Sequence, residues 1–212
     1  MPINESLERY TGSLAALDKE FAAYARAKAA AFAPDANLDE PELPRNADLE
    51  VLAAWVKENP TSYRGLQRYA AKLLGEEKWE DAKAPLNRLL ELCPEYDGRD
   101  GPLWMLARVH REMGETQEER AALEKIAKFD DNAVDVYLRL AELCAAEEDW
   151  EAAIENAELA LAVNPLIQAP HRHLADAASG LNDHQRAAEG LLSLAEMDPF
   201  DPAEIHFQSA RH

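Results

Sequence analysis

The chain holds six histidines, and their spacing decides whether it could carry a catalytic metal. Zinc hydrolysis on a helix needs His-Glu-x-x-His, because histidines four residues apart share one helix face and the glutamate acts as general base. That motif is absent, and the histidines of the string HRH, His171 and His173, would point about 200° apart around a helix. His206 and His212 lie on the last helix without a partner motif. The sequence therefore predicts no metal site.

Nucleophilic and phosphate chemistry also lack a motif. No Gly-x-Ser-x-Gly elbow and no Walker-type phosphate loop occurs in the sequence. The stretch 97–101 lacks the alternating carboxylates and closing glutamate of a calcium loop, which predicts a turn there. Cys144 falls on the inner stripe of a helix and Cys93 stands beside Pro94 without a nearby histidine, which indicates buried thiols. We therefore expect no enzyme activity and no cofactor.

Composition narrows the class of partner. The chain has 212 residues, of which 47% are hydrophobic, and 41 acidic residues against 22 basic ones give a net charge of −19. The apolar fraction and the even spread of charge predict one folded domain, or one with a small appendage. A surface with this excess of acidic residues repels phosphate backbones and anionic lipids. We therefore expect neither nucleic acid nor a membrane as partner. The start of the chain lacks a signal-peptide pattern, and the compartment stays unknown.

The elements that position the remaining polar residues follow from a repeat. Pro60, Pro94, Pro165 and Pro199, with Asp131 in the missing place, are spaced 34, 37, 34 and 34 residues apart. Small residues keep the same step at Ala70, Ala107, Ala141, Ala175 and Ala210. Apolar residues recur at helical spacing inside each unit, which predicts pairs of antiparallel helices that approach closely at the small residues.

These landmarks resemble the tetratricopeptide repeat, a helix–turn–helix unit of 34 residues. The stretch 135–165 carries the small residues, the turn aromatic Trp150 and the closing proline of that family, and 63–94 carries the same set with Trp79. The resemblance implies an all-α fold, a right-handed α-solenoid of helix pairs with an N-terminal helical appendage.

Three residues depart from the family pattern. Glu119 and Asp131 stand where the family prefers alanine and proline, and His184 stands where an aromatic ring is usual. Pro85 falls inside a predicted helix, which predicts a kink. The helix pairs are expected at 63–75 with 79–92, 101–113 with 116–129, 134–147 with 150–163, and 168–181 with 184–197.

The predicted organisation has three parts. An N-terminal helical segment spans 1–33, a linker rich in proline and acid spans 34–47, and a repeat array spans 48–212. The array is divided into a half repeat 48–60, full repeats 63–96, 100–133, 134–167 and 168–201, and a partial or capping helix 202–212. Because that helix carries Ile205 and Phe207, we expect an unsealed end that further sequence or self-association stabilises.

In this family the first helix of each pair lines a concave groove. The residues expected there are Arg64, Gln67, Arg68, Trp104, Arg108, Arg111, Leu138, Arg139, Glu142, Arg172, His173 and Asp176. Counted over 63–76, 100–113, 134–147 and 168–181, the first helices hold 7 basic and 7 acidic residues, so the groove is neutral and rich in arginine inside an acidic molecule. The arginines either bind a partner's carboxylates or pair with acids of neighbouring helices. The surplus of three residues in the interval of 37 falls in the glycine-bearing loop 95–102. Trp104 either anchors a ligand or fills the gap beside this lengthened loop.

The sequence leaves two functional interpretations. The leading one is a non-enzymatic scaffold that binds a protein or peptide in the groove, with an acidic or carboxylate-bearing segment docked on the arginines. The carboxylate clamp of chaperone-binding family members is not assigned, because Gln67 and Ala71 stand where lysine and asparagine are required. The alternative is an accessory region of a larger protein, since a helix, linker and repeats in this order are similar to the part that follows the gluzincin-type, metallopeptidase-like domain in some bacterial proteins.

Overall fold

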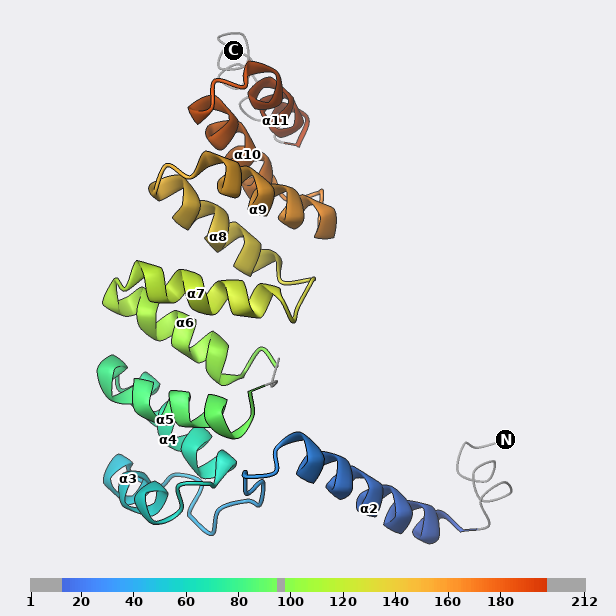
Figure 1. Ribbon diagram of the computed structural model, residues 1–212, viewed down its shortest axis with the longest axis vertical. Coiled ribbons are helices and arrows are strands. Elements are labelled where there is room, and N and C mark those ends of the chain that lie inside the picture. The colour runs from blue at the N-terminus through green and yellow to red at the C-terminus, as the bar shows by residue number, and fades with distance from the viewer. Residues whose placement is uncertain (1–12, 95–97, 198–212) are drawn as a thin grey trace. The chain divides into compact units, whose positions relative to one another are not determined.

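A computed structural model describes residues 13–94 and 98–197 of the chain (Figure 1). Within those ranges the chain forms ten helices, α2 to α11, and no strand. One isolated parallel β-bridge joins Asn37 to Ser62. The predicted all-α class is confirmed. The chain divides into two compact units, residues 1–96 and 97–212, which are described separately.

The first unit contains α2 (Leu14–Phe32), α3 (Leu49–Glu58), α4 (Tyr63–Gly75) and α5 (Trp79–Leu92). α4 and α5 form an antiparallel pair, and α3 packs against α4. Leu66, Leu73 and Leu86 are buried in this part of the unit. α2 differs, because its apolar side chains face water: Phe21 is 67% and Tyr24 60% exposed.

The second unit contains α6 (Pro102–Met113), α7 (Thr116–Ala127), α8 (Val134–Ala146), α9 (Trp150–Val163), α10 (Gln168–Gly180) and α11 (His184–Met197). Each helix packs against its partner in the pair, and α7 against α8 and α9 against α10 join successive pairs. The bounds of the paired helices α4 to α11 agree with the predicted ranges to within two residues.

Helix ends follow from the residues that occupy them. The hydroxyl of Ser62 accepts a hydrogen bond from the Gly65 N–H at 3.3 Å and begins α4, and Asp149 begins α9 in the same way. Gly114 ends α6 with φ 71°, a left-handed conformation that favours glycine. Pro85 is buried inside α5, which continues to Leu92. The predicted kink at Pro85 stays a prediction.

Small residues set the distance between paired helices. The predicted landmarks Ala70 and Ala141 are each 0% exposed, which confirms that they lie where neighbouring helices meet, and Ala82, Ala153 and Ala187 in the second helices of their pairs are also 0% exposed. A larger side chain at such a place would push the helices apart, and the loss of close packing destabilises the fold. The 34-residue period of small residues in the sequence therefore reflects the need for close packing at the same place in each repeat.

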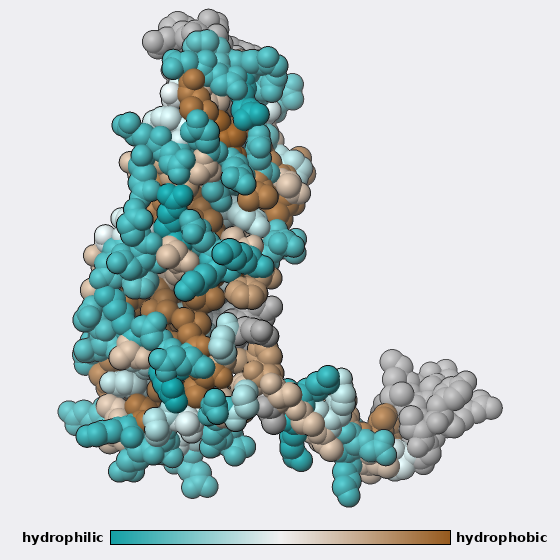
Figure 2. Space-filling view, in the orientation of Figure 1, coloured by the Kyte–Doolittle hydropathy of each residue, from teal (hydrophilic) through white to brown (hydrophobic). Residues whose placement is uncertain are grey.

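The surface is mostly hydrophilic, and part of the predicted array lies outside the described residues. Hydrophilic residues cover much of the visible face of each unit, as the net charge of −19 leads one to expect (Figure 2). No helix in the described ranges is long and apolar enough to cross a membrane. The predicted capping helix 202–212 lies outside the described residues. So do six residues named from the sequence: Pro199, Ile205, His206, Phe207, Ala210 and His212.

Candidate functional site

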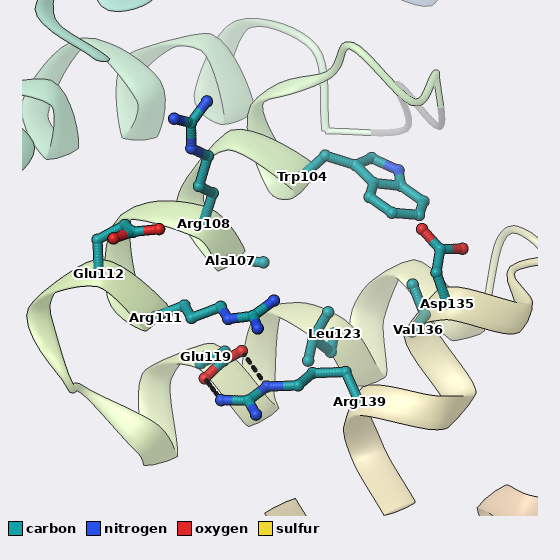
Figure 3. A pocket seen from close by; sticks show the side chains of 10 residues that line it. All are labelled: Trp104, Ala107, Arg108, Arg111, Glu112, Glu119, Leu123, Asp135, Val136 and Arg139. Atoms are coloured by element: carbon teal, nitrogen blue, oxygen red, sulfur yellow. Dashed lines mark hydrogen bonds and ion pairs between the residues drawn. The ribbon is translucent and has the colours of Figure 1, made fainter. Parts of the chain in front are cut away.

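A hollow of about 310 Å³ opens in the second unit where α6, α7 and α8 meet (Figure 3). It contains four of the residues predicted to line the groove, namely Trp104, Arg108, Arg111 and Arg139. Its other lining residues are Ala107, Glu112, Glu119, Leu123, Asp135 and Val136. α6 and α8 are the first helices of their pairs, so the hollow lies on the elements from which a groove was predicted.

A buried ion pair lies at one side of the hollow. Glu119 of α7 is 3% exposed, although it occupies a place that holds buried alanines in other repeats. Arg139 of α8 donates from Nε to Glu119 Oε1 at 2.8 Å and from Nη2 to Oε2 at 2.9 Å. These two parallel hydrogen bonds compensate the buried carboxylate, and they raise the pKa of Arg139 further. Arg139 thus pairs with an acid of a neighbouring helix, one of the two alternatives left open for the arginines.

Trp104 lies at the opposite side of the hollow from this pair (Figure 3). The guanidinium of Arg99, a residue of the loop before α6, lies 5.2 Å from the centroid of the indole. Arg99 Nη2 also lies 3.5 Å from Asp130 Oδ2 and 3.6 Å from Asp135 Oδ1. Sequence reasoning missed Arg99, and the only signal for it was the surplus of three residues in this loop. Trp104 both lines the hollow and packs against the lengthened loop.

Arg108 and Arg111 are exposed on one face of α6. In Figure 3, Arg111 extends across the hollow above the Glu119 carboxylate, whereas Arg108 points away from that pair. Arg111 forms no ion pair with any residue in the described ranges. A guanidinium without a partner presents a planar fork of donors that fits a carboxylate in two-point geometry. The lining holds three arginines and three acids, so recognition here depends on the placement of donors and not on excess positive charge.

The other groove residues predicted on the second unit do not line the hollow. Glu142 of α8 accepts a hydrogen bond from Arg139 Nη1 at 2.9 Å. His173 of α10 lies with Nε2 4.0 Å from Glu142 Oε1. The remaining three are Leu138 on α8, which is half-buried, and Arg172 and Asp176 on α10, which are exposed.

Three predicted groove residues belong to α4 in the first unit. Arg64 Nε donates to the Leu38 carbonyl at 3.1 Å, and its Nη1 lies 3.3 Å from Glu40 Oε2. Arg68 donates to the Pro44 carbonyl. Gln67 is half-buried on the same helix. Both arginines of α4 therefore contact the linker that precedes the array.

Metal and thiol chemistry find little support in the described residues. No group of three or more histidine, cysteine or carboxylate side chains in those ranges is placed to hold a metal ion. Cys93 and Cys144 are buried thiols, as predicted. Burial raises the pKa of Cys144, which disfavours the reactive thiolate.

Comparison with known proteins identifies the fold. No family model and no curated protein sequence matches the chain. MamA from Desulfovibrio magneticus RS-1 is similar with a TM-score of 0.57 and 19% identity, over 73% of this chain and 86% of that one. MamA AMB-1 gives a TM-score of 0.62 at 16% identity, over 75% and 85%. YrrB, described as a TPR protein with an unusual peptide-binding site, gives 0.60 at 12% identity, over 77% and 82%.

Identities this low show the fold alone. The chain is an all-α protein of the tetratricopeptide-repeat fold, in agreement with its 34-residue period and its paired helices. The likeness to gluzincin-type proteins is not shown by these comparisons and stays a prediction. What the similar proteins bind is not carried over to this chain by the fold.

Proposed function

We propose that the chain is an interaction scaffold that binds an extended, carboxylate-bearing peptide segment of a partner protein in the α6–α8 hollow. The observation that carries this proposal is the combination, in one open hollow, of an indole and of Arg111, a guanidinium without an ion pair in the described ranges. The description of YrrB, a protein of the same fold, as having a peptide-binding site supports the general class of function.

The charges around the hollow favour a peptide over a polyanion. Glu119 and Arg139 neutralise each other, which leaves Arg111 on α6 as the donor for an incoming carboxylate, with Arg108 on the same helix nearby. Asp135 and Glu112 also line the hollow and repel a ligand with closely spaced negative charges. The net charge of −19 opposes nucleic acid in the same way.

Trp104 supplies the apolar part of the recognition. Buried aromatic residues contribute strongly to binding when a partner side chain excludes water from them. The expected ligand therefore carries a bulky apolar residue near its carboxylate, so that the two groups reach the two sides of the hollow together. Such a pairing specifies a short motif and not merely an acidic patch.

A selection experiment tests the proposal. A displayed peptide library is selected on the immobilised intact chain, and the enriched peptides are measured by calorimetry. We expect enrichment of an acidic residue close to an apolar one, and a loss of affinity of about tenfold or more in the double variant Arg108→Ala with Arg111→Ala. Affinity should also fall with added salt.

A matched variant separates the site from general charge effects. Lys125→Ala with Lys128→Ala removes two positive charges from exposed places of the second unit that do not line the hollow. It should leave peptide affinity unchanged within about twofold. Enriched peptides that bind the Arg108 and Arg111 double variant as tightly as the intact chain would refute the proposed site.

A further inference from the structure

The segment that joins α2 to α3 lies along α4, and we name its residues 37–47 the strap. The Asn37 N–H donates to the Thr61 carbonyl at 2.8 Å, and the Tyr63 N–H donates to the Asn37 carbonyl at 2.9 Å. These bonds form the parallel bridge just before α4 begins. An extended chain is therefore held by its backbone at the start of a helix that, by its place in the repeat, faces the groove.

The side chains of α4 extend this contact along the strap. Arg64 binds the Leu38 carbonyl and the Glu40 carboxylate, and Arg68 binds the Pro44 carbonyl. Carbonyl acceptors and a carboxylate are groups that any extended acidic peptide presents. The two arginines thus recognise the course of a backbone and one negative charge, which is the recognition expected of a peptide-binding surface.

Arg68 has a counterpart in the second unit. It lies two repeats before Arg139, at the same place of the repeat, since the spacing of 71 residues equals one interval of 37 and one of 34. Arg139 is occupied by the buried carboxylate of Glu119, whereas Arg68 is occupied by the strap. The same place in two repeats thus binds an acceptor from a preceding segment.

The strap is held by buried apolar residues and by polar contacts that are open to water. Ala33, which precedes the strap, is 2% exposed, its last residue Ala47 is 8% exposed, and Pro41 in its middle is also buried. In contrast, the side chains of Arg64 and Glu40 are 56% and 70% exposed. Ion pairs so open to water contribute little to stability. The ion pair between Arg64 and Glu40 is therefore weak, and the tether favours it by keeping the strap close to α4.

We propose that the α4 face with Arg64 and Arg68 is a second peptide-binding surface, which takes an extended partner segment containing proline and carboxylates, and that the strap covers it as an intramolecular copy of that ligand. A short tether gives an effective concentration in the millimolar range, so weak contacts keep the surface covered until a partner competes. Prolines keep such a segment extended with its carbonyls open to donors. This surface shares no residue with the α6–α8 hollow.

The first test replaces the strap. Residues 38–46 are exchanged in the intact chain for a glycine and serine sequence of equal length, and a synthetic peptide of residues 36–47 is titrated by calorimetry. We expect the strap-replaced chain to bind the peptide with a dissociation constant at least about tenfold lower than the intact chain, because the glycine and serine segment lacks the Glu40 carboxylate and the prolines that keep the strap extended, and therefore competes less. Adding Arg64→Ala with Arg68→Ala should abolish this binding.

Two control variants are made in the strap-replaced chain. Lys72→Ala with Arg26→Ala removes the same charge from α4 and α2 and should leave binding unchanged. Arg108→Ala with Arg111→Ala should also leave it unchanged, which keeps this inference separable from the function proposed for the hollow. A strap-replaced chain with full helical content that binds the peptide no better than the intact chain would overturn the inference.

The second test uses the intact chain and decides the matter if the replacement does not fold. Hydrogen exchange is followed at two amides while the same peptide is added to millimolar concentration. Displacement of the strap should speed exchange of the chain's own Asn37 amide, whereas the Tyr63 amide stays protected by the carbonyl of the incoming peptide. Unchanged exchange at Asn37 under saturating peptide would show that the strap is a fixed part of the fold.

Discussion

Glu119 places a carboxylate where neighbouring repeats bury a methyl group. Ala82, Ala153 and Ala187, at the same place of their repeats, are 0% exposed, and Glu119 is 3% exposed. A buried charge is tolerated only when a well-oriented partner compensates the loss of water. Arg139 provides that partner, and it retains Glu142 as a second acceptor on its water-accessible side.

The pair should therefore respond asymmetrically to truncation. Arg139→Ala leaves the Glu119 carboxylate buried without its partner and should lower the free energy of unfolding by about 3 kcal/mol. Glu119→Ala restores the residue type of the other repeats, and Arg139 keeps Glu142, so the loss should be less than about 1 kcal/mol. Urea unfolding monitored by circular dichroism measures both values.

The double variant provides the internal control. Glu119→Ala with Arg139→Ala removes both charges and should be about as stable as Glu119→Ala alone, because the harmful unpaired carboxylate no longer exists. Arg186→Ala, which breaks exposed ion pairs at 3.8 Å and 3.9 Å, should change stability by less than about 0.5 kcal/mol. Additive losses in the double variant would contradict this account.

Two buried acidic groups predict a loss of stability in alkali. Burial raises the pKa of the Cys144 thiol and of the Tyr137 phenol in the folded chain. In the unfolded chain, thiols and phenols lose their protons near about pH 8.5 and 10. Above each of these values the unfolded state is stabilised relative to the folded state, so the free energy of unfolding falls. Stability should be full below about pH 8 and decrease as the pH rises further.

Unfolding in urea at increasing pH checks this linkage. The combined variant Cys144→Ala with Tyr137→Phe should lose less stability between about pH 8 and 10.5 than the intact chain. The comparison uses the difference between the two pH values for each protein, so any direct packing effect of the substitutions cancels. Equal pH dependence in both proteins would show that neither group contributes.

The residue scale also shows where sequence reasoning ended. Glu119 was recognised as a departure from the family and Arg139 as a groove residue, but their mutual contact depends on how α7 packs against α8. Neither residue by itself predicts how far α7 is shifted along α8, and this shift decides which side chains meet. Arg99 was missed for a related reason, since its position over Trp104 depends on the course of an irregular loop.

At the scale of elements, the helices were predictable and the strap was not. Helix bounds follow from periodic apolar residues and from small residues at a fixed step, and the observed bounds of α4 to α11 agree to within two residues. The strap has no such period. Its contacts use the carbonyls of Leu38 and Pro44, which every residue type supplies, so no pattern of side chains could predict them.

The packing of α10 against α11 gives a prediction at this scale. A Cβ added to Gly190 would lie 2.9 Å from the His171 carbonyl oxygen and 3.1 Å from the Ala175 Cβ. Gly190→Ala should therefore lower stability by about 1–3 kcal/mol, although alanine favours helix by about 1 kcal/mol over glycine. Thermal unfolding monitored by circular dichroism measures the change.

Gly75 in α4 is the matched control. A Cβ there would meet nothing within 4 Å, so only the helix preference of alanine acts. Gly75→Ala should raise stability by up to about 1 kcal/mol. If both glycine variants were stabilised, the helices at Gly190 would not approach as closely as described.

At the scale of the whole molecule, charge dominates. The net charge of −19 is spread over a chain in which most ion pairs are exposed. Self-repulsion of the acids opposes the compact state, and salt screens it. Because exposed pairs contribute little, the melting temperature should rise between about 0.02 and 0.3 M sodium chloride.

A charge-reduced variant tests the origin of this salt effect. Glu20→Gln, Glu50→Gln, Glu151→Gln and Glu155→Gln remove exposed charges that form no ion pair in the described ranges. The variant should melt at a higher temperature than the intact chain in low salt and respond less to added salt. A melting temperature that falls with salt in the intact chain would mean that attractive pairs outweigh the repulsion.

The sequence predicted a groove lined by the first helix of each pair, but the period did not predict that the chain divides into two compact units. The described groove residues fall in two compact units, with Arg64, Gln67 and Arg68 in the first and the others in the second. The interval of 37 residues is also where the units divide, since the loop 95–102 carries the surplus residues. A repeat period describes contacts within and between regular pairs and contains no information on where such a division falls.

The position of Trp104 gives the chain an optical reporter of its own hollow. The sequence has four tryptophans, and the other three, Trp55, Trp79 and Trp150, do not line the hollow. Among the residues that line the hollow, Trp104 is the one tryptophan, and the Arg99 guanidinium lies over its ring. A ligand that covers the indole or displaces Arg99 changes the polarity around it, and therefore the intensity and wavelength of its fluorescence. Occupancy of this site can be followed by emission in unlabelled protein, with Trp104→Phe as the silent reference.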